Sequence, residues 1–212
     1  MPIKIARLGI LVSGHSRGTN VQAILDAISD GQLHAEVALL VATSQEHGAV
    51  ERASQNGVKT LILPSDAHDS PEAWDHRVAD AFYEEGVSVV ALAGYLRKIS
   101  HVLLEAFPNR ILNVHPALLP SFGGKGMYGM RVHQAVLEYG CKVSGCTVHL
   151  VNERYDTGPI IAQAVVTVEE NDTPESLSAR VQTQEHRLYP RCIEWMIQDQ
   201  LRVEGRRVRR KG

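Results

Sequence analysis

The sequence predicts an α/β fold, with a Rossmann-like, mostly parallel open sheet, helices on both faces and a hairpin-like sheet extension towards the C-terminus. Short runs rich in Val, Ile and Leu alternate with segments of helical period through the first half of the chain. After Gly140 the pattern changes to two strand-like stretches joined by a turn. No repeat, low-complexity stretch or long linker interrupts the 212 residues, so we expect one domain over residues 1–212.

The strands are predicted from short apolar runs, which are typical of parallel strands buried on both faces. These runs cover residues 5–12, 37–42, 60–63, 87–92 and 111–114. Residues 143–151 and 160–168 are expected to form the two later strands. The turn Asp156-Thr157-Gly158-Pro159 lies between them.

Helices are predicted between the strands. The first has apolar residues at three- and four-residue spacing and a glycine stop, namely Val21, Ile24, Leu25, Ile28 and Gly31. A second is expected to begin at Pro71. A long helix is expected from about Pro174, with Pro190 kinking or breaking it. The arginine-rich end, residues 206–211, is expected to be a solvated tail.

The composition bears on partners and compartment. A net charge of -2 gives no reason to expect nucleic acid or an anionic membrane as a partner, which leaves small molecules. The run 87–93 is far shorter than the roughly 20 residues of a membrane span, and residues 1–12 lack a signal-peptide pattern. We therefore expect a cytoplasmic location. The three cysteines are expected to be reduced thiols without a metal, namely Cys141, Cys146 and Cys192.

Residues 13–20, Ser-Gly-His-Ser-Arg-Gly-Thr-Asn, connect the first strand to the first helix. Backbone N–H groups and the helix dipole favour an anion there, so a phosphate fits. The segment is not a P-loop, because no Lys follows Gly18, and its glycine spacing does not match a dinucleotide fingerprint. The alternative is a plain turn in which Thr19 or Asn20 caps the helix.

Residues 113–120, Asn-Val-His-Pro-Ala-Leu-Leu-Pro, follow the fifth strand at the sheet edge where open α/β sheets bind ligands. Alternation along an extended segment places Asn113 and His115 on one side. An amide N–H and a protonated imidazole can both donate to an oxygen that gains charge in a tetrahedral intermediate. Taken alone, the pair favours a structural role, in which His115 caps the strand and Asn113 satisfies loop backbone.

These segments resemble the phosphoribosylglycinamide formyltransferases, the folate-dependent enzymes of purine synthesis. The resemblance rests on residues 113–120, on Asp156-Thr157-Gly158-Pro159 and on residues 181–186, Val-Gln-Thr-Gln-Glu-His, in the same order and at compatible distances. It also includes residues 18–20 and 93–97 and extends from Ile5 to about Val208.

The resemblance implies a formyltransferase fold, with a phosphate-binding half over about residues 1–100 and a catalytic, folate-binding half over about residues 101–208. It implies transfer of the formyl group of 10-formyltetrahydrofolate to the amine of 5-phosphoribosylglycinamide, in IMP biosynthesis and without a metal. The implied catalytic residues are Asn113, His115 and Asp156. The implied binding residues are Gly18, Thr19, Asn20 and Glu185 for the ribonucleotide, and Leu96, Arg97, Lys98, Ile99 and Asn113 for the folate.

The sequence departs from the best-known bacterial members at three places. Two extra residues stand near Ser16 and Arg17, where Arg17 is either a further phosphate contact or a solvated charge. Residues 121–130 form a longer, Gly-rich loop that we expect to be a mobile cover. Pro71 stands where those members have an Arg that meets the folate tail.

Three other functions are compatible with parts of this pattern. Formyltetrahydrofolate deformylase would use the same three residues with water, but it has an N-terminal regulatory domain that we do not expect here. Methionyl-tRNA formyltransferase needs a C-terminal tRNA-binding domain, which we do not expect within these 212 residues. A non-catalytic sugar-phosphate sensor would use only the first loop. The oligomeric state is left open between monomer and homodimer.

Overall fold

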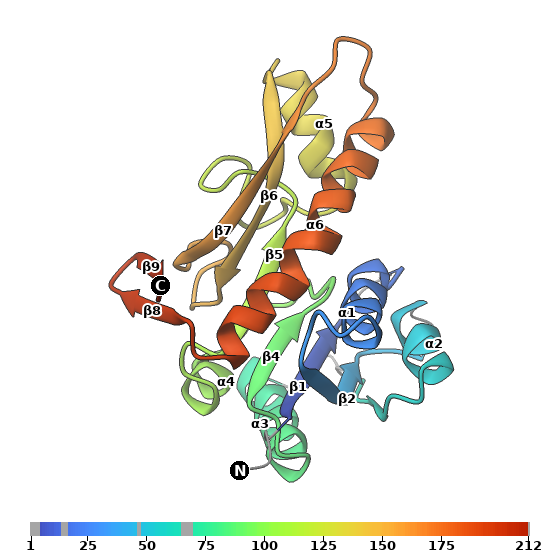
Figure 1. The fold of residues 1–212 in the computed structure, drawn as a ribbon, viewed down its shortest axis with the longest axis vertical. Coiled ribbons are helices and arrows are strands. Elements are labelled where there is room, and N and C mark those ends of the chain that lie inside the picture. Colours follow the sequence, from blue (N-terminus) through green and yellow to red (C-terminus); the bar gives the residue numbers. More distant parts are fainter. Residues whose placement is uncertain (1–4, 14–16, 46–47, 65–69, 212) are drawn as a thin grey trace.

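The computed structural model describes residues 5–13, 17–45, 48–64 and 70–211. These residues contain a nine-stranded mixed sheet with helices on both faces (Figure 1). The strands are β1 Ala6–Val12, β2 Ala35–Ala42, β3 Thr60–Ile62, β4 Val89–Leu92, β5 Ile111–His115, β6 Val143–Leu150, β7 Ile160–Thr167, β8 Leu201–Glu204 and β9 Arg207–Arg210. The helices are α1 Thr19–Ser29, α2 Gly48–Gln55, α3 Pro71–Glu84, α4 His101–Ala106, α5 Met130–Glu138 and α6 Pro174–Ile197.

The order of strands across the sheet is β3-β2-β1-β4-β5-β6-β7-β9-β8. Strands β1 to β5 pair in parallel, β6 is antiparallel to β5, and β7 is antiparallel to β6. The predicted parallel sheet with a hairpin-like extension is therefore confirmed. Because β2 and β4 lie on opposite sides of β1, the order reverses there, and such a switch point is where open α/β sheets bind ligands.

Two apolar clusters fill the two faces of the sheet. One joins α1, α2 and α6 to the sheet and includes Ile24, Val181 and Ile193. The other joins α3 and α4 to the opposite face around Trp74 and Phe82. The helical periodicity read from the sequence for α1 and α3 thus matches the faces that they bury. None of the described helices is long and apolar enough to cross a membrane.

Of the two expectations for Pro190, a break of the last helix is wrong, because α6 continues from Pro174 to Ile197, whereas a kink stays a prediction. Pro190 itself is buried, and so are Tyr189 and Ile193 beside it. The Tyr189 hydroxyl lies 2.9 Å from the carbonyl oxygens of both Leu92 and Leu112. Packing against β4 and β5 therefore offsets the backbone hydrogen bond that a proline removes.

The expectation of a solvated C-terminal tail was also wrong. The basic residues form the hairpin β8–β9, in which Val203 pairs with Val208. Ile160 of β7 pairs with Arg207 of β9, so the hairpin joins the edge of the sheet (Figure 1). The signal that was overlooked is the alternation of Leu201, Val203 and Val208 with charged residues, because these three side chains pack on the core.

Candidate active site

Asn113 and His115 lie in the last three residues of β5, at the carboxyl edge of the sheet beside the switch point. Asn113 pairs with His149 of β6, and His115 pairs with Thr147. Alternation along the strand puts the two β5 side chains on one face, as the sequence predicts. His115 is only 3% exposed, whereas Asn113 is half-buried.

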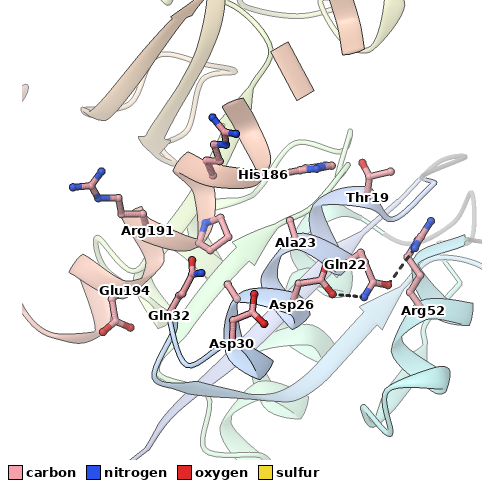
Figure 2. Close-up of a pocket in the computed structure, with 13 residues that line it drawn as sticks. Thr19, Gln22, Ala23, Asp26, Asp30, Gln32, Arg52, His186, Arg191 and Glu194 are labelled. Atoms are coloured by element: carbon pink, nitrogen blue, oxygen red, sulfur yellow. Dashed lines mark hydrogen bonds between the residues drawn. The ribbon is translucent and has the colours of Figure 1, made fainter. Parts of the chain in front are cut away.

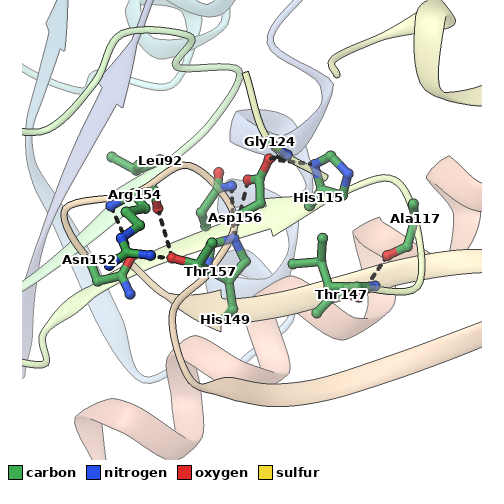
Figure 3. Close-up of polar contacts among 12 residues, drawn as sticks. Leu92, His115, Ala117, Gly124, Thr147, His149, Asn152, Arg154, Asp156 and Thr157 are labelled. Carbon is green, nitrogen blue, oxygen red and sulfur yellow. Dashed lines mark hydrogen bonds and ion pairs between the residues drawn. The ribbon is translucent and has the colours of Figure 1, made fainter. Parts of the chain in front are cut away.

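His115 and Asp156 come together at this edge, from segments 41 residues apart in the chain (Figure 3). Nδ1 of His115 lies 3.6 Å from Oδ2 of Asp156. The other ring nitrogen, Nε2, lies 2.8 Å from the carbonyl oxygen of Phe122, so Nε2 carries the hydrogen in this arrangement. The backbone N–H of Gly124 donates to Oδ2 of Asp156 at 2.8 Å. The start of the Gly-rich loop thus contacts both side chains.

His149 is the buried residue that links the members of the predicted trio. Its Nδ1 lies 2.8 Å from the Leu150 carbonyl oxygen, which makes Nδ1 the protonated nitrogen. Its Nε2 lies 3.2 Å from Nδ2 of Asn113 and 3.6 Å from Oδ1 of Asp156. One imidazole therefore fixes the Asn113 amide and stands beside the Asp156 carboxylate.

Asp156 lies in the turn from β6 to β7, in a left-handed conformation with φ 54° that few non-glycine residues adopt. Gly158 permits this turn, because a Cβ there would lie 1.7 Å from the carbonyl oxygen of Leu150. The Thr157 hydroxyl donates to Oδ1 of Asn152 at 3.0 Å and closes the turn. These contacts hold the turn that carries the Asp156 side chain.

Burial and neighbouring charge act oppositely on the two ionisable groups. Burial lowers the pKa of His115, while the Asp156 charge and the Phe122 carbonyl oppose that effect. Burial disfavours the Asp156 carboxylate, yet His149, His115 and the Gly124 N–H keep the pKa of Asp156 below its ordinary value. At neutral pH the pair is therefore a neutral imidazole beside a carboxylate. This differs from the protonated imidazole that the sequence suggested, because His115 is almost fully desolvated.

A cavity of about 760 Å³ opens over these residues. It includes all three predicted catalytic residues and the whole predicted folate stretch from Leu96 to Ile99. From the predicted ribonucleotide residues it includes Asn20 and Glu185, with Arg17 beside them. The structure therefore brings these predicted residues to one cavity. Its walls also include residues that the sequence did not single out for binding, namely Tyr95, Ser178, Gln182, Tyr155 and His133.

Gly18 and Thr19 are absent from this lining. Gly18, with φ 73°, precedes α1 in a left-handed conformation, and a Cβ there would lie 2.5 Å from Cα of Ala49. The position therefore needs glycine, and no side chain of the described residues caps α1, contrary to the alternative of a Thr19 or Asn20 cap. Thr19 accepts a hydrogen bond from Gln182, at 3.0 Å. Residues 14–16 of the predicted phosphate loop lie outside the described residues.

Thr19 instead lines a second hollow, of about 590 Å³, between α1 and α6 (Figure 2). Figure 2 shows Asp26 on α1 and Asp30 at the C-cap of α1 on one side of the hollow, with His186 and Arg191 on α6 on the other. Charges of both signs line this hollow, and it contains none of the predicted catalytic residues.

Glu185 is 8% exposed, and its carboxylate lies 3.4 Å from Nδ2 of Asn20. Burial raises the pKa of Glu185 to about 7, and the Asn20 hydrogen bond offsets only part of this effect. Because the folded pKa exceeds the unfolded one, Glu185 becomes destabilising as pH rises from about 4.5 through about 7.

We therefore expect Glu185→Gln, which is neutral and of the same shape, to be more stable than the parent protein at pH 8. The difference in free energy of unfolding should grow between pH 5 and pH 8 by roughly 2 to 3 kcal/mol. Urea unfolding at both pH values measures it. Glu84→Gln, on the exposed face of α3, is the matched control. If the difference in free energy of unfolding between the two proteins did not change with pH, burial would not be raising the pKa of Glu185.

The structure also describes parts of the three departures from the bacterial pattern, although Ser16 lies outside the described residues. Arg17 lines the cavity but is exposed, so both expectations for it stay open. Residues 124–130 line the cavity, as expected for a cover, and the mobility of this loop stays a prediction. Pro71 is the first residue of α3, with Ser70 as N-cap, and it is not part of the cavity lining.

All three cysteines are free thiols, as predicted.

Comparisons with known proteins agree with this geometry. Residues 6–193 match the family model described as "Formyl transferase". The chain is 44% identical over 197 residues to "Phosphoribosylglycinamide formyltransferase, chloroplastic" of Arabidopsis thaliana, covering 92% of this chain and 67% of that one. It is 36% identical over 194 residues to "Phosphoribosylglycinamide formyltransferase" of Escherichia coli (strain K12), covering 92% and 88%.

Among solved structures, glycinamide ribonucleotide transformylase 1 from Symbiobacterium toebii matches with a TM-score of 0.91 at 43% identity. The match covers 98% of this chain and 95% of that one. The α/β architecture, the sheet extension and the sequence likeness thus agree over nearly the whole length. This chain belongs to the formyl transferase family.

Proposed function

We propose that this protein transfers the formyl group of 10-formyltetrahydrofolate to the amine of 5-phosphoribosylglycinamide. The products are N-formylglycinamide ribonucleotide and tetrahydrofolate, in purine (IMP) biosynthesis. The observation that carries the proposal is the single cavity that holds Asn113, His115 and Asp156 together with residues 96–99 and Glu185. It is large enough for two substrates to meet, and the named relatives are formyltransferases acting on this ribonucleotide.

In this proposal, the amine nitrogen attacks the formyl carbon, and the carbonyl electron pair moves to oxygen. Asn113 keeps one amide hydrogen on His149 and has the second available for that oxygen. Nε2–H of His115 is the other donor once its contact with Phe122 is released. The carbon–nitrogen bond to the folate then breaks, and the oxygen returns its electron pair to the carbonyl.

The amine loses one proton and the departing folate nitrogen gains one, so the protein must only relay a proton. His115, neutral because of its burial, can accept it at Nδ1, which faces Asp156 at 3.6 Å. The Asp156 carboxylate stabilises the imidazolium while it exists. Alignment of amine and formyl carbon in one cavity supplies a large further share of the rate.

Asn20 and Glu185, which line the same cavity, are the groups we assign to the ribonucleotide, with Gly18 and Thr19 for its phosphate through backbone N–H groups. Leu96, Arg97, Lys98 and Ile99 are assigned to the folate. Arg97 is held over the Trp74 ring at 4.8 Å, which fixes this stretch. A cytoplasmic location, and a monomer or homodimer without nucleic acid or membrane partners, stay predictions.

One assay tests the proposal: 10-formyltetrahydrofolate is incubated with the protein, and tetrahydrofolate is followed with and without the ribonucleotide. We expect release only when both are present. Release without the ribonucleotide would replace the proposal by the hydrolase, and ribonucleotide binding without release would replace it by the sensor. Heat-denatured protein gives the background of spontaneous hydrolysis.

A further inference from the structure

We propose that the C-terminal hairpin β8–β9 holds the Asp156 turn in place, with Arg206 as its positioning residue. The inference rests on the role proposed above for Asp156. Arg206 lies at the hairpin turn and is not among the residues that the sequence assigned to catalysis or binding. Its guanidinium donates through Nη1 to the carbonyl oxygen of Thr157 at 3.1 Å.

Residues 151–159, here called the β6–β7 connector, are held at separate points. Asn152 accepts hydrogen bonds from the Arg154 N–H and the Thr157 hydroxyl, at 3.2 and 3.0 Å, near the β6 end. The Gly124 N–H holds the Asp156 carboxylate. Arg206 is the described side chain that reaches the connector between Asp156 and β7.

The hairpin is itself anchored, so that Arg206 is not a loose surface charge. The Arg210 guanidinium lies 5.0 Å from the centre of the Trp195 ring on α6. The Lys211 N–H donates to the Gln200 carbonyl oxygen at 2.7 Å. Next to Arg206, Arg207 pairs with Ile160 in the sheet. These contacts fix the hairpin to the end of α6 and to β7, so that Arg206 is held in place beside the Asp156 turn.

The open space behind the Asp156 turn explains why the turn depends on the Arg206 contact. A groove of about 910 Å³ lies there, lined by residues 151–158 and by Arg206. Asp156 borders both this groove and the large cavity. The connector is therefore a thin wall with open space on both sides, and its left-handed Asp156 needs external support.

The proposal predicts a selective loss. In Arg206→Ala the turn can shift towards the groove, so Asp156 moves away from His115, His149 and the Gly124 N–H, which favour its carboxylate. Tyr155, the residue before it, is a further ionisable neighbour. We expect kcat to fall about three- to tenfold, with KM for both substrates within twofold. The acid limb of the kcat profile should move to lower pH, because the Asp156 charge that raises the pKa of the neutral base His115 moves away. His149 and His133 are the other ionisable groups that act on His115 or are affected by it.

Arg206→Lys should restore most of kcat, since an ammonium can donate to the same carbonyl. Arg209→Ala is the matched control, because Arg209 is an exposed residue of the same hairpin that pairs with Glu204. Hydrogen exchange of the Gly124 amide gives a readout independent of turnover. It should quicken in Arg206→Ala and stay unchanged in Arg209→Ala.

Parent-like kcat, acid limb and Gly124 exchange in Arg206→Ala would overturn the positioning role. Equal losses in Arg206→Ala and Arg209→Ala would overturn it as well, because they would indicate a general effect of hairpin charge. Asp156→Asn is measured in the same series. If that variant keeps full turnover, the proposed function of Asp156 fails, and the exchange result still decides whether the hairpin holds the turn.

Discussion

Asp156→Asn should lower kcat by about a thousandfold while leaving KM for both substrates nearly unchanged. The change keeps the shape of the side chain and the acceptor for the Gly124 N–H, and it removes the negative charge 3.6 Å from His115 Nδ1. Without that charge, the imidazolium that forms during proton relay has no counter-ion in a buried place. Steady-state kinetics with both substrates varied measures the effect.

Glu153→Gln is the control for Asp156→Asn, because Glu153 is an exposed acid of the same connector. Its kcat should stay within twofold of the parent value. A loss confined to KM in Asp156→Asn would show that the carboxylate serves ground-state binding. That outcome would remove Asp156 from the proton relay proposed here.

The second large effect is expected for His115→Ala, with kcat lower by about a hundred- to a thousandfold. The variant loses both the Nε2–H donor and the nitrogen that accepts the proton. Because His115 is 3% exposed, the truncation also leaves a cavity, so circular dichroism and the melting temperature must confirm folding. His101→Ala, at the exposed start of α4, controls for loss of a histidine as such.

Combining His115→Ala with Asp156→Asn distinguishes a shared role from separate roles. If the two residues form one relay, the double variant should be scarcely slower than the slower of the two single variants. Multiplication of the two losses would mean that each residue acts independently, and the contact at 3.6 Å would then have no catalytic meaning.

The parts of the fold that depend on local pattern were predictable. The Val- and Ile-rich runs and the spacing of Val21 to Ile28 depend only on which face is buried, and the structure confirms them. The failures involve long-range contacts. Pro190 is tolerated because α6 packs on β4 and β5, and the charged end forms strands because β7 offers an edge. The strands β4 and β5 are far from Pro190 in the sequence, and β7 is far from the charged C-terminal residues.

The placement of Asn113 and His115 could also be predicted, because it depends only on alternation along one strand, which puts both side chains on one side. His149 could not be given its place between Asn113 and Asp156, because its contact depends on the register of β5 against β6. That register is fixed by packing over the whole sheet and not by residues near His149. The Phe122 carbonyl was missed because a backbone acceptor leaves no mark in the sequence.

The contact between Phe122 and His115 changes how an incoming formyl group would be received. In the free protein, Nε2–H of His115 already points at a carbonyl oxygen, 2.8 Å away, on a residue with φ 53°. A formyl oxygen that reaches this hydrogen therefore replaces another carbonyl oxygen, that of Phe122. The buried Nε2–H of His115 thus has a hydrogen-bond acceptor both before and after the replacement. The Phe122 carbonyl oxygen thus occupies the acceptor position that a substrate carbonyl would take at His115 Nε2–H.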